Sequence, residues 1–372
     1  MAGAGGLESC MIRTEHLLPG DMPGTQHQFY SYHFGQPDAA GPHVYLQAGL
    51  HADELPGVLL LHRLCRRLAL LEQEGRLPGR ITVVPMANPP GMAQHWHGLH
   101  HGRFAAASGE NFNRHYPDLS AHAAELIRRQ GMTVPRALQA ALAALPDCSM
   151  LGRLRHTLFA MALQADYVLD LHCDSEAVLH LYGNLRHAGE AGRLAGWLQA
   201  EATLLCDEAG GMSFDDAIVQ NWRRLELQLG EKLAIPFAAT VELRGVADVS
   251  ETLAARDETA LLGWLMAIGA LAETLAVPPA APRAATLLAA VECVTAPHGG
   301  IVVYQLDYGQ WLPAGSRLGY VLDPQSGAQS PLVNRQAGFY FARVAGRLVT
   351  TGADVAYLAG EHALRSGMLL TA

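Results

Sequence analysis

The sequence predicts an α/β domain followed by a smaller all-β domain, and two changes of pattern carry this prediction. Through about residue 275, short apolar or β-branched runs alternate with longer segments whose apolar residues recur at helical spacing. After the proline-rich segment AVPPAAPRAA, short β-rich runs are separated by glycine, proline and asparagine turns. We therefore expect one domain at 1–277, a linker at 278–285 and a second domain at 286–372.

The first domain is expected to contain a mostly parallel sheet with helices on both faces, because predicted strands and helices alternate along it. Strands are predicted at 27–33, 43–49, 80–86, 165–171, 177–182 and 238–243. Helices are predicted at 54–73, 119–130, 134–145, 152–164, 187–202, 215–229 and 251–275. Ligands of such sheets bind beyond the carboxyl ends of the strands, so polar residues at strand ends are the first candidates for a site.

The second domain is predicted from the runs GGIVVYQL, SRLGYVLD, GFYFARV and DVAYLAG. Its turn spacing resembles the barrel-sandwich fold of biotinyl and lipoyl domains. Those carriers attach their cofactor to an exposed lysine, but the single lysine of the chain, Lys232, lies outside this domain. A swinging-arm role is therefore excluded, which leaves a structural lid, a substrate-selecting wall or an oligomer contact.

The composition argues against several classes of function. The net charge of -9 disfavours a nucleic-acid binder, which normally carries a basic face. The six cysteines are scattered without a CxxC pair, as expected of reduced cytosolic thiols. The N-terminus lacks the basic start and apolar core of a signal peptide, and the longest apolar stretch, 260–272, is too short to span a bilayer. We expect a cytoplasmic protein without membrane insertion; a homo-oligomer stays open.

The pattern HxxE occurs at His51/Glu54, His122/Glu125 and His187/Glu190. Composition alone accounts for about one chance match, so context has to separate the three pairs. The predicted strand HVYLQAGL runs directly into His51, and a predicted helix follows. This places His51 on a strand-to-helix turn and Glu54 in the first helical turn, near enough to share a metal. The other two pairs are predicted to lie on solvated helix faces.

A third metal ligand is predicted in ADYVLDLHCDS, where a buried strand ends at His172. Two histidines and one glutamate form a known catalytic zinc set that leaves a coordination position for water. Asp170, or a neighbouring backbone carbonyl, is placed to accept the second imidazole N–H. The alternative is a hydrogen-bonded strand-end histidine without a metal. Cys173 is expected to be a packed thiol, since adjacent strand residues point to opposite faces.

The motifs occur in the order HxxE, NPxG, NxNR, DLH and a late VEL glutamate. This order resembles the succinylglutamate desuccinylase and aspartoacylase family, a branch of the zinc carboxypeptidase superfamily, over residues 40 to 275. The resemblance implies a zinc-carboxypeptidase-like mixed sheet and one Zn²⁺ per chain. It implies the following site residues: His51, Glu54 and His172 as metal ligands, Glu242 as general base and acid, Asn113 and Arg114 as a carboxylate grip, and Arg103 as the group that polarises the scissile carbonyl.

The residue types suit this chemistry. AATVELRG is predicted as a strand whose end brings Glu242 beside the metal, where a carboxylate can take a proton from water and pass it to a leaving amine. The fork of Arg114 matches a carboxylate with two parallel hydrogen bonds, although a surface ion pair is the alternative. For Arg103, a surface role and a catalytic role stay equally open.

A cluster of four histidines, His95, His97, His100 and His101, follows ANPPGM. His-rich tracts bind metals, so a second metal site is one interpretation. The favoured one is a long loop near the pocket mouth in which one histidine contacts substrate and the others are solvated.

These observations predict a zinc-dependent hydrolase that cleaves the amide bond of a small N-acyl amino acid or related carboxylate. One alternative is a metallocarboxypeptidase acting on peptides or cell-wall fragments; a closed pocket under the β domain would favour small substrates, and an open groove would favour peptides. Another is a non-catalytic metal- or ligand-binding module, against which Glu242 argues because a binding protein needs no proton shuttle.

Overall fold

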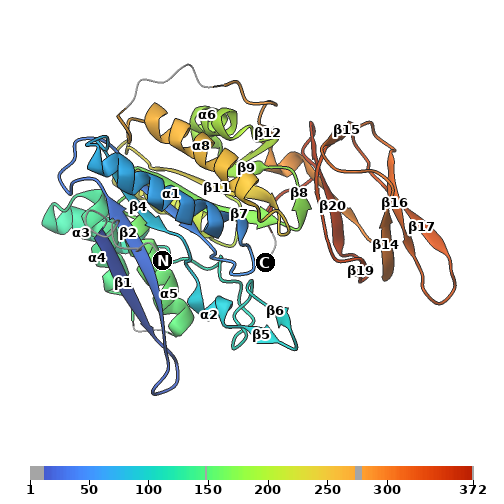
Figure 1. Cartoon of the computed structure of the whole chain (residues 1–372), viewed down its shortest axis with the longest axis horizontal. Coiled ribbons are helices and arrows are strands. Elements are labelled where there is room, and N and C mark those ends of the chain that lie inside the picture. The colour runs from blue at the N-terminus through green and yellow to red at the C-terminus, as the bar shows by residue number, and fades with distance from the viewer. Residues whose placement is uncertain (1–11, 147–148, 273–278, 371–372) are drawn as a thin grey trace, which may run out of the picture.

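The computed structural model describes residues 12–146, 149–272 and 279–370. Its centre is a nine-stranded mixed sheet with the order β1-β2-β4-β3-β7-β11-β9-β10-β12 (Figure 1). The strands are β1 (Ile12–Pro19), β2 (Gln26–Phe34), β3 (His43–Ala48), β4 (Arg80–Val84), β7 (Tyr167–Asp174), β9 (His180–Asn184), β10 (Ala202–Cys206), β11 (Phe237–Gly245) and β12 (Thr286–Leu287). Five of the eight pairings are parallel, which confirms the mostly parallel sheet.

Helices cover both faces of this sheet (Figure 1). One face carries α1 (Pro56–Gln73), α6 (Ala188–Leu198) and α8 (Glu251–Ala267). The other carries α3 (Ser120–Gln130), α4 (Val134–Ala143), α5 (Met150–Ala162) and α7 (Phe214–Leu229). Successive strand residues point to opposite faces of the sheet and so belong to different cores. Leu46 and Leu169 lie in the core under α1, α6 and α8, and Tyr45 and Val168 lie in the core under the other four helices. A short helix, α2 (Pro89–Met92), follows β4.

The structure corrects several predicted elements. The single strand expected at 177–182 is wrong, because β8 (Glu176–Ala177) pairs in the C-terminal sheet and β9 pairs in the central one. The helix expected at 187–202 ends at Leu198, where Gln199 turns left-handed, and β10 follows. The helix expected at 251–275 ends at Ala267; residues 273–275 lie outside the described ranges. β1 had no prediction because, as an exposed edge strand, it lacks an apolar face.

The C-terminal region consists of two antiparallel sheets, as predicted for an all-β domain. One has the order β13-β20-β18-β15, with β8 also pairing to β18, and the other the order β17-β16-β14-β19. Their strands are β13 (Val291–Thr295), β14 (Gly300–Tyr304), β15 (Gln310–Leu312), β16 (Arg317–Leu322), β17 (Gln329–Val333), β18 (Gly338–Arg343), β19 (Leu348–Val349) and β20 (Asp354–Gly360).

The two regions are joined by more than the chain connection. β12 lies beyond the expected linker at 278–285, yet it pairs with β10 in the central sheet. Glu176 forms ion pairs with Arg343 and Arg347 of the β region. An apolar cluster with members such as Leu204 and Phe341 also spans the contact. None of the helices formed by the described residues is long and apolar enough to cross a membrane.

Candidate active site

Three neighbouring strands bring His51, His172 and Glu242 together at their carboxyl ends. β3, β7 and β11 are adjacent and parallel, and Glu242 on β11 is in register with His172 on β7. His51 follows the end of β3. The N-terminus of α1 lies close above these strands because residue 57 is glycine: a Cβ there would be 2.9 Å from Leu171 Cβ. The prediction that Glu54 lies in the first turn of α1 is wrong, because the helix begins at Pro56 and Glu54 precedes it.

His51, Glu54 and His172 form one buried group. His51 Nδ1 lies 2.9 Å from Glu54 Oε1, and His172 Nδ1 lies 2.7 Å from Glu54 Oε2. One donor atom from each residue lies within 4.8 Å of the others. Two imidazole nitrogens and a carboxylate suit Zn²⁺, and three ligands leave a position for water or substrate. Burial opposes ionisation of Glu54, but the two histidines hold its pKa well below the ordinary value.

The second ring nitrogen of each histidine is also engaged. His51 Nε2 lies 2.8 Å from Asn111 Oδ1, and His172 Nε2 lies 2.9 Å from Asp170 Oδ2. Because each second nitrogen is held in this way, both Nδ1 atoms face Glu54. Metal-bound histidines are generally oriented by such a contact at the second ring nitrogen. Asp170 was one of the two partners predicted for His172. Asn111 was missed, although it is the first asparagine of the NxNR motif.

Asp170 ends a chain of buried polar groups. Tyr45 donates its hydroxyl to Gln47 Oε1 (2.8 Å), and Gln47 Nε2 donates to Asp170 Oδ1 (3.0 Å). Gln47 and Asp170 are fully buried. Such a chain of buried hydrogen bonds restricts the orientation of its members.

Glu242 lines the same cavity as His51 and His172. Its Oε2 atom is buried and has no hydrogen-bond partner among the described residues. Burial, followed by the negative charge of Glu54, raises the pKa of Glu242 well above its ordinary value. Asp174, at the end of β7, is a further acid in the cavity, and burial raises its pKa too. Glu242 thus places a carboxyl group with a buried oxygen beside His51 and His172.

The three polar residues predicted to contact substrate occupy different positions around the candidate metal group. Arg103 Nη1 donates to Glu54 Oε1 (3.1 Å), and its side chain is 44% exposed. Arg114 is buried, lines the cavity and donates from Nη1 to the Asn113 carbonyl (2.7 Å). Asn113 accepts from the Phe214 N–H through Oδ1 (2.8 Å), while Nδ2 lies 3.2 Å from His172 Nε2. Its amide is therefore oriented by the protein, even though the residue borders the cavity.

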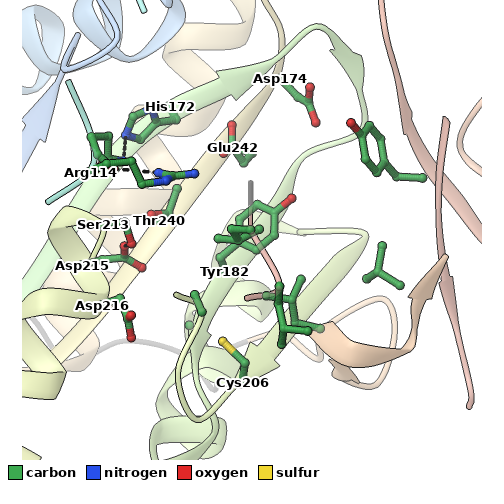
Figure 2. Close-up of a pocket in the computed structure, with 18 of the residues that line it drawn as sticks. Arg114, His172, Asp174, Tyr182, Cys206, Ser213, Asp215, Asp216, Thr240 and Glu242 are labelled. Atoms are coloured by element: carbon green, nitrogen blue, oxygen red, sulfur yellow. Dashed lines mark hydrogen bonds between the residues drawn. The ribbon is translucent and has the colours of Figure 1, made fainter. Parts of the chain in front are cut away.

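The cavity has a volume of about 190 Å³ and is bounded by both regions of the chain. Figure 2 shows His172, Glu242 and Arg114 at one end and Asp216 with Cys206 at the other. Its lining includes residues that the sequence analysis did not identify: Tyr182, Asp215 and Asp216 from the α/β domain, and Phe341, Tyr357 and Leu369 from the C-terminal region. No local motif marks them, because only the packing of the two regions turns them towards the same space.

The remaining histidine patterns do not form a second metal-ligand group. Among the described residues, the group of His51, Glu54 and His172 stands alone as a possible metal site. The four-histidine segment forms a two-stranded hairpin of β5 (His95–Trp96) and β6 (Leu99–His100). Of the other HxxE pairs, His122 and Glu125 lie on the exposed face of α3, as predicted. The prediction is wrong for His187, which is half-buried in the turn before α6 and packs against Phe237.

Comparisons with known proteins agree with this arrangement. Residues 40–268 match the model of the succinylglutamate desuccinylase/aspartoacylase catalytic domain. No curated protein sequence matches the chain. A protein described as a putative succinylglutamate desuccinylase/aspartoacylase from Shewanella frigidimarina has a structure with a TM-score of 0.81, at 25% identity over 94% of this chain and 97% of that one.

Two further solved structures are similar. One is a putative family protein from Shewanella amazonensis, with a TM-score of 0.80 at 26% identity over 94% of this chain and 98% of that one. The other is the product-bound ectoine utilization protein from Ruegeria pomeroyi, which shares the fold with a TM-score of 0.68 at 19% identity over 95% and 97%. Because the family model covers more than half of the sequence, the chain belongs to the succinylglutamate desuccinylase/aspartoacylase family.

Proposed function

We propose that the protein is a zinc-dependent hydrolase that cleaves the amide bond of a small N-acyl amino acid or related carboxylate. One observation carries the proposal: two histidine Nδ1 atoms and the Glu54 carboxylate converge beside Glu242, whose buried Oε2 has no partner among the described residues. Membership of a deacylase family supports the same reaction class.

His51, Glu54 and His172 would hold the zinc ion. When bound, zinc lowers the pKa of a water ligand towards neutrality and polarises a carbonyl oxygen. Glu242 takes a proton from the attacking water and delivers it to the amine as the amide C–N bond breaks, so that water and the amide become a carboxylic acid and an amine. Its raised pKa suits both steps, because it retains a proton at higher pH than an ordinary glutamate.

Two arginines have distinct proposed roles. Arg103 reaches the edge of the metal-ligand group, where its guanidinium can stabilise negative charge that develops on the scissile carbonyl. Arg114, bordered by Asn113, lines the cavity and would bind a substrate carboxylate through its guanidinium. Asn113 contributes to this grip by holding the loop in place through Phe214.

The size of the cavity favours a small substrate over a peptide. Pockets for drug-sized ligands have volumes of roughly 300 to 1,000 Å³, whereas this cavity has about 190 Å³ and is bounded by Phe341, Tyr357 and Leu369 of the C-terminal region. This supports a deacylase over a metallocarboxypeptidase. A proton-carrying acid beside the ligands argues against a non-catalytic binding module.

We also propose a cytoplasmic location, since the described cysteines are free.

A panel of N-acetyl, N-formyl and N-succinyl amino acids tests the function by amine release. We expect release by the zinc-loaded protein, loss on treatment with a zinc chelator and recovery when zinc is restored. The exposed variant Glu125→Gln should match the wild type. If the zinc-loaded protein released amino acids from the C-termini of peptides and hydrolysed none of the panel, the carboxypeptidase alternative would replace the proposal.

A further inference from the structure

The buried face of α5 carries an arginine. Its other buried residues recur at helical spacing and are all apolar, and Arg155 lies among them at 7% exposure. The stem of an arginine can pack on apolar neighbours, but a buried guanidinium is costly unless its donors are engaged. Arg155 must therefore have partners that offset the cost of its burial.

Those partners lie in the loop that contains the NxNR motif. Arg155 Nη2 donates to the Asn111 carbonyl (2.9 Å), and Nη1 donates to Glu110 Oε2 (3.0 Å). The Glu110 side chain is 40% exposed, and an ion pair with an acid so exposed contributes little. Asn111 is buried, and a buried carbonyl needs a donor. The contact with Asn111 is therefore the one that explains a buried arginine here.

The shape of the loop explains why this donor comes from a helix. The two arms of the loop run antiparallel, and backbone hydrogen bonds of 2.8 Å and 3.2 Å flank the pair of Phe104 and Asn111. Asn111 therefore faces Phe104 as a non-hydrogen-bonded pair, in which the backbone groups of each residue point away from the opposite arm. Arg155 of α5 meets the Asn111 carbonyl on this outer side.

Asn111 passes the constraint on to a predicted metal ligand. Its Oδ1 accepts the Asn113 N–H (2.8 Å) and lies 2.8 Å from His51 Nε2. The main chain of Asn111 is thus held by Arg155, while its side chain holds His51. Contacts behind a metal-bound imidazole orient the ring and strengthen its binding. Arg155 itself does not line the cavity.

We propose that Arg155 is a positioning residue for the candidate metal group of His51, Glu54 and His172. It fixes Asn111, Asn111 fixes the ring of His51, and the affinity for zinc thereby depends on a side chain of α5 that lies outside the cavity. The proposal rests on the zinc site of the proposed function, but zinc binding can be measured without any substrate.

A double-mutant cycle tests the route through Asn111. Zinc affinity is measured by competition with a chelator of known affinity. Asn111→Ala should weaken binding by about 10- to 100-fold, and Arg155→Met by a smaller factor, about three- to ten-fold, because it acts through one further contact. In the Asn111→Ala background, Arg155→Met should change the affinity by less than about two-fold, since the side chain that joins Arg155 to His51 is gone. Equal losses in both backgrounds would overturn the proposal, because they would show a general effect on the fold.

Two further variants sharpen the comparison. Glu110→Gln is the matched control: it removes the ion pair of Arg155 and keeps the donor to Asn111, so zinc affinity should stay within about two-fold of the wild type. A loss as large as that of Arg155→Met would assign the effect to the ion pair and reject the role of Asn111. Arg155→Lys keeps one charged donor and should bind zinc with an affinity between those of the wild type and Arg155→Met. It replaces the methionine variant in the cycle if the latter does not fold, which the melting temperature of the zinc-free protein shows.

Hydrolysis of the N-acyl amino acid panel separates this proposal from the function on which it rests. Zinc affinity that depends on Arg155 through Asn111, without hydrolysis of any member of the panel, would reject the deacylase function and retain the positioning role. Hydrolysis of the panel, together with wild-type zinc affinity in folded Arg155→Met, would reject the positioning role and retain the function.

Discussion

The Asp170 carboxylate lies 2.9 Å from His172 Nε2, on the side of the ring opposite to Glu54, which lies 2.7 Å from Nδ1. Both acids raise the pKa of His172 well above its ordinary value, although burial alone would lower it. The two residues are separated by Leu171 on β7, so strand alternation places their side chains on the same face of the sheet. Gln47 in turn holds Asp170.

Asp170→Asn is expected to weaken zinc binding by about 10- to 100-fold, because a carboxylate behind a metal-bound imidazole fixes the ring and strengthens it as a ligand. The measurement is competition with a chelator of known zinc affinity. Asp38→Asn, an exposed change of the same type, serves as the control. Equal affinity in wild type and Asp170→Asn would mean that the contact has no influence on the metal.

His51→Ala and His172→Ala should each remove most of the single zinc ion from the purified protein. Loss of one ligand from a set of three leaves too few donors for tight binding. His122→Ala, which changes an exposed histidine of another HxxE pair on α3, should retain zinc. Elemental analysis gives the metal content, and full zinc in both cavity variants would exclude this group as the metal site.

Glu242→Gln should lower kcat by at least about 10², the lower end of general acid–base contributions, while zinc content stays unchanged. Glutamine preserves size but cannot take up the proton. The assay is steady-state hydrolysis of the best substrate of the panel, accompanied by zinc analysis. If kcat of this variant equalled that of the wild type, Glu242 would have only a structural role in β11.

Substrates with a free carboxylate should be preferred over their carboxamides by about ten- to a hundred-fold, since an unpaired buried guanidinium loses a charged hydrogen bond worth about 1.5–3 kcal/mol. Arg114→Lys should lose much of this preference because an ammonium cannot form the fork. The test compares kcat/KM for each pair, with the exposed Arg129→Lys as control. A wild-type ratio near one would remove the carboxylate role from Arg114.

Asp216→Asn is expected to stabilise the unliganded protein at neutral pH. The pKa of Asp216 rises from 3.8 to about 6 on folding, so the folded state holds the proton to higher pH and stability falls as pH increases through this window. A pKa difference of this size corresponds to a destabilisation of the folded state by roughly 3 kcal/mol above pH 6. The melting temperature of the variant should exceed that of the wild type at pH 7.5, and the gap should narrow towards pH 4.5. If the difference in melting temperature did not depend on pH, burial of the Asp216 carboxylate would not destabilise the folded protein.

Much of the candidate metal group of His51, Glu54 and His172 could be predicted because its signals are local. His51 and His172 each follow a short apolar strand, and strand ends of a parallel sheet meet at one edge. The pairing of Glu242 with His172 follows from the register of β11 on β7, which no local pattern encodes. Asn111 was missed because its role depends on a loop that places it beside His51, and that contact joins two distant parts of the chain.

The wrong secondary-structure predictions also arise from contacts between distant parts of the chain. Residues 176–184 look like one β-rich run, but two sheets compete for it, so β8 joins the C-terminal region and β9 the central sheet. The start of β10 has apolar residues that continue the pattern of α6, so the sequence alone does not mark where the helix ends.

The class of the fold and the residue types of the His51, Glu54 and His172 group could be predicted from the sequence, because residue type and hydrophobic periodicity act over a few neighbouring positions. The shape and charge of the cavity depend on tertiary packing. Asp216 enters it from the first turn of α7, Tyr357 from β20 and Leu369 from the segment after the last strand. Their neighbours in space are set by strand order and by the contact between the two regions, which no local pattern in the sequence encodes.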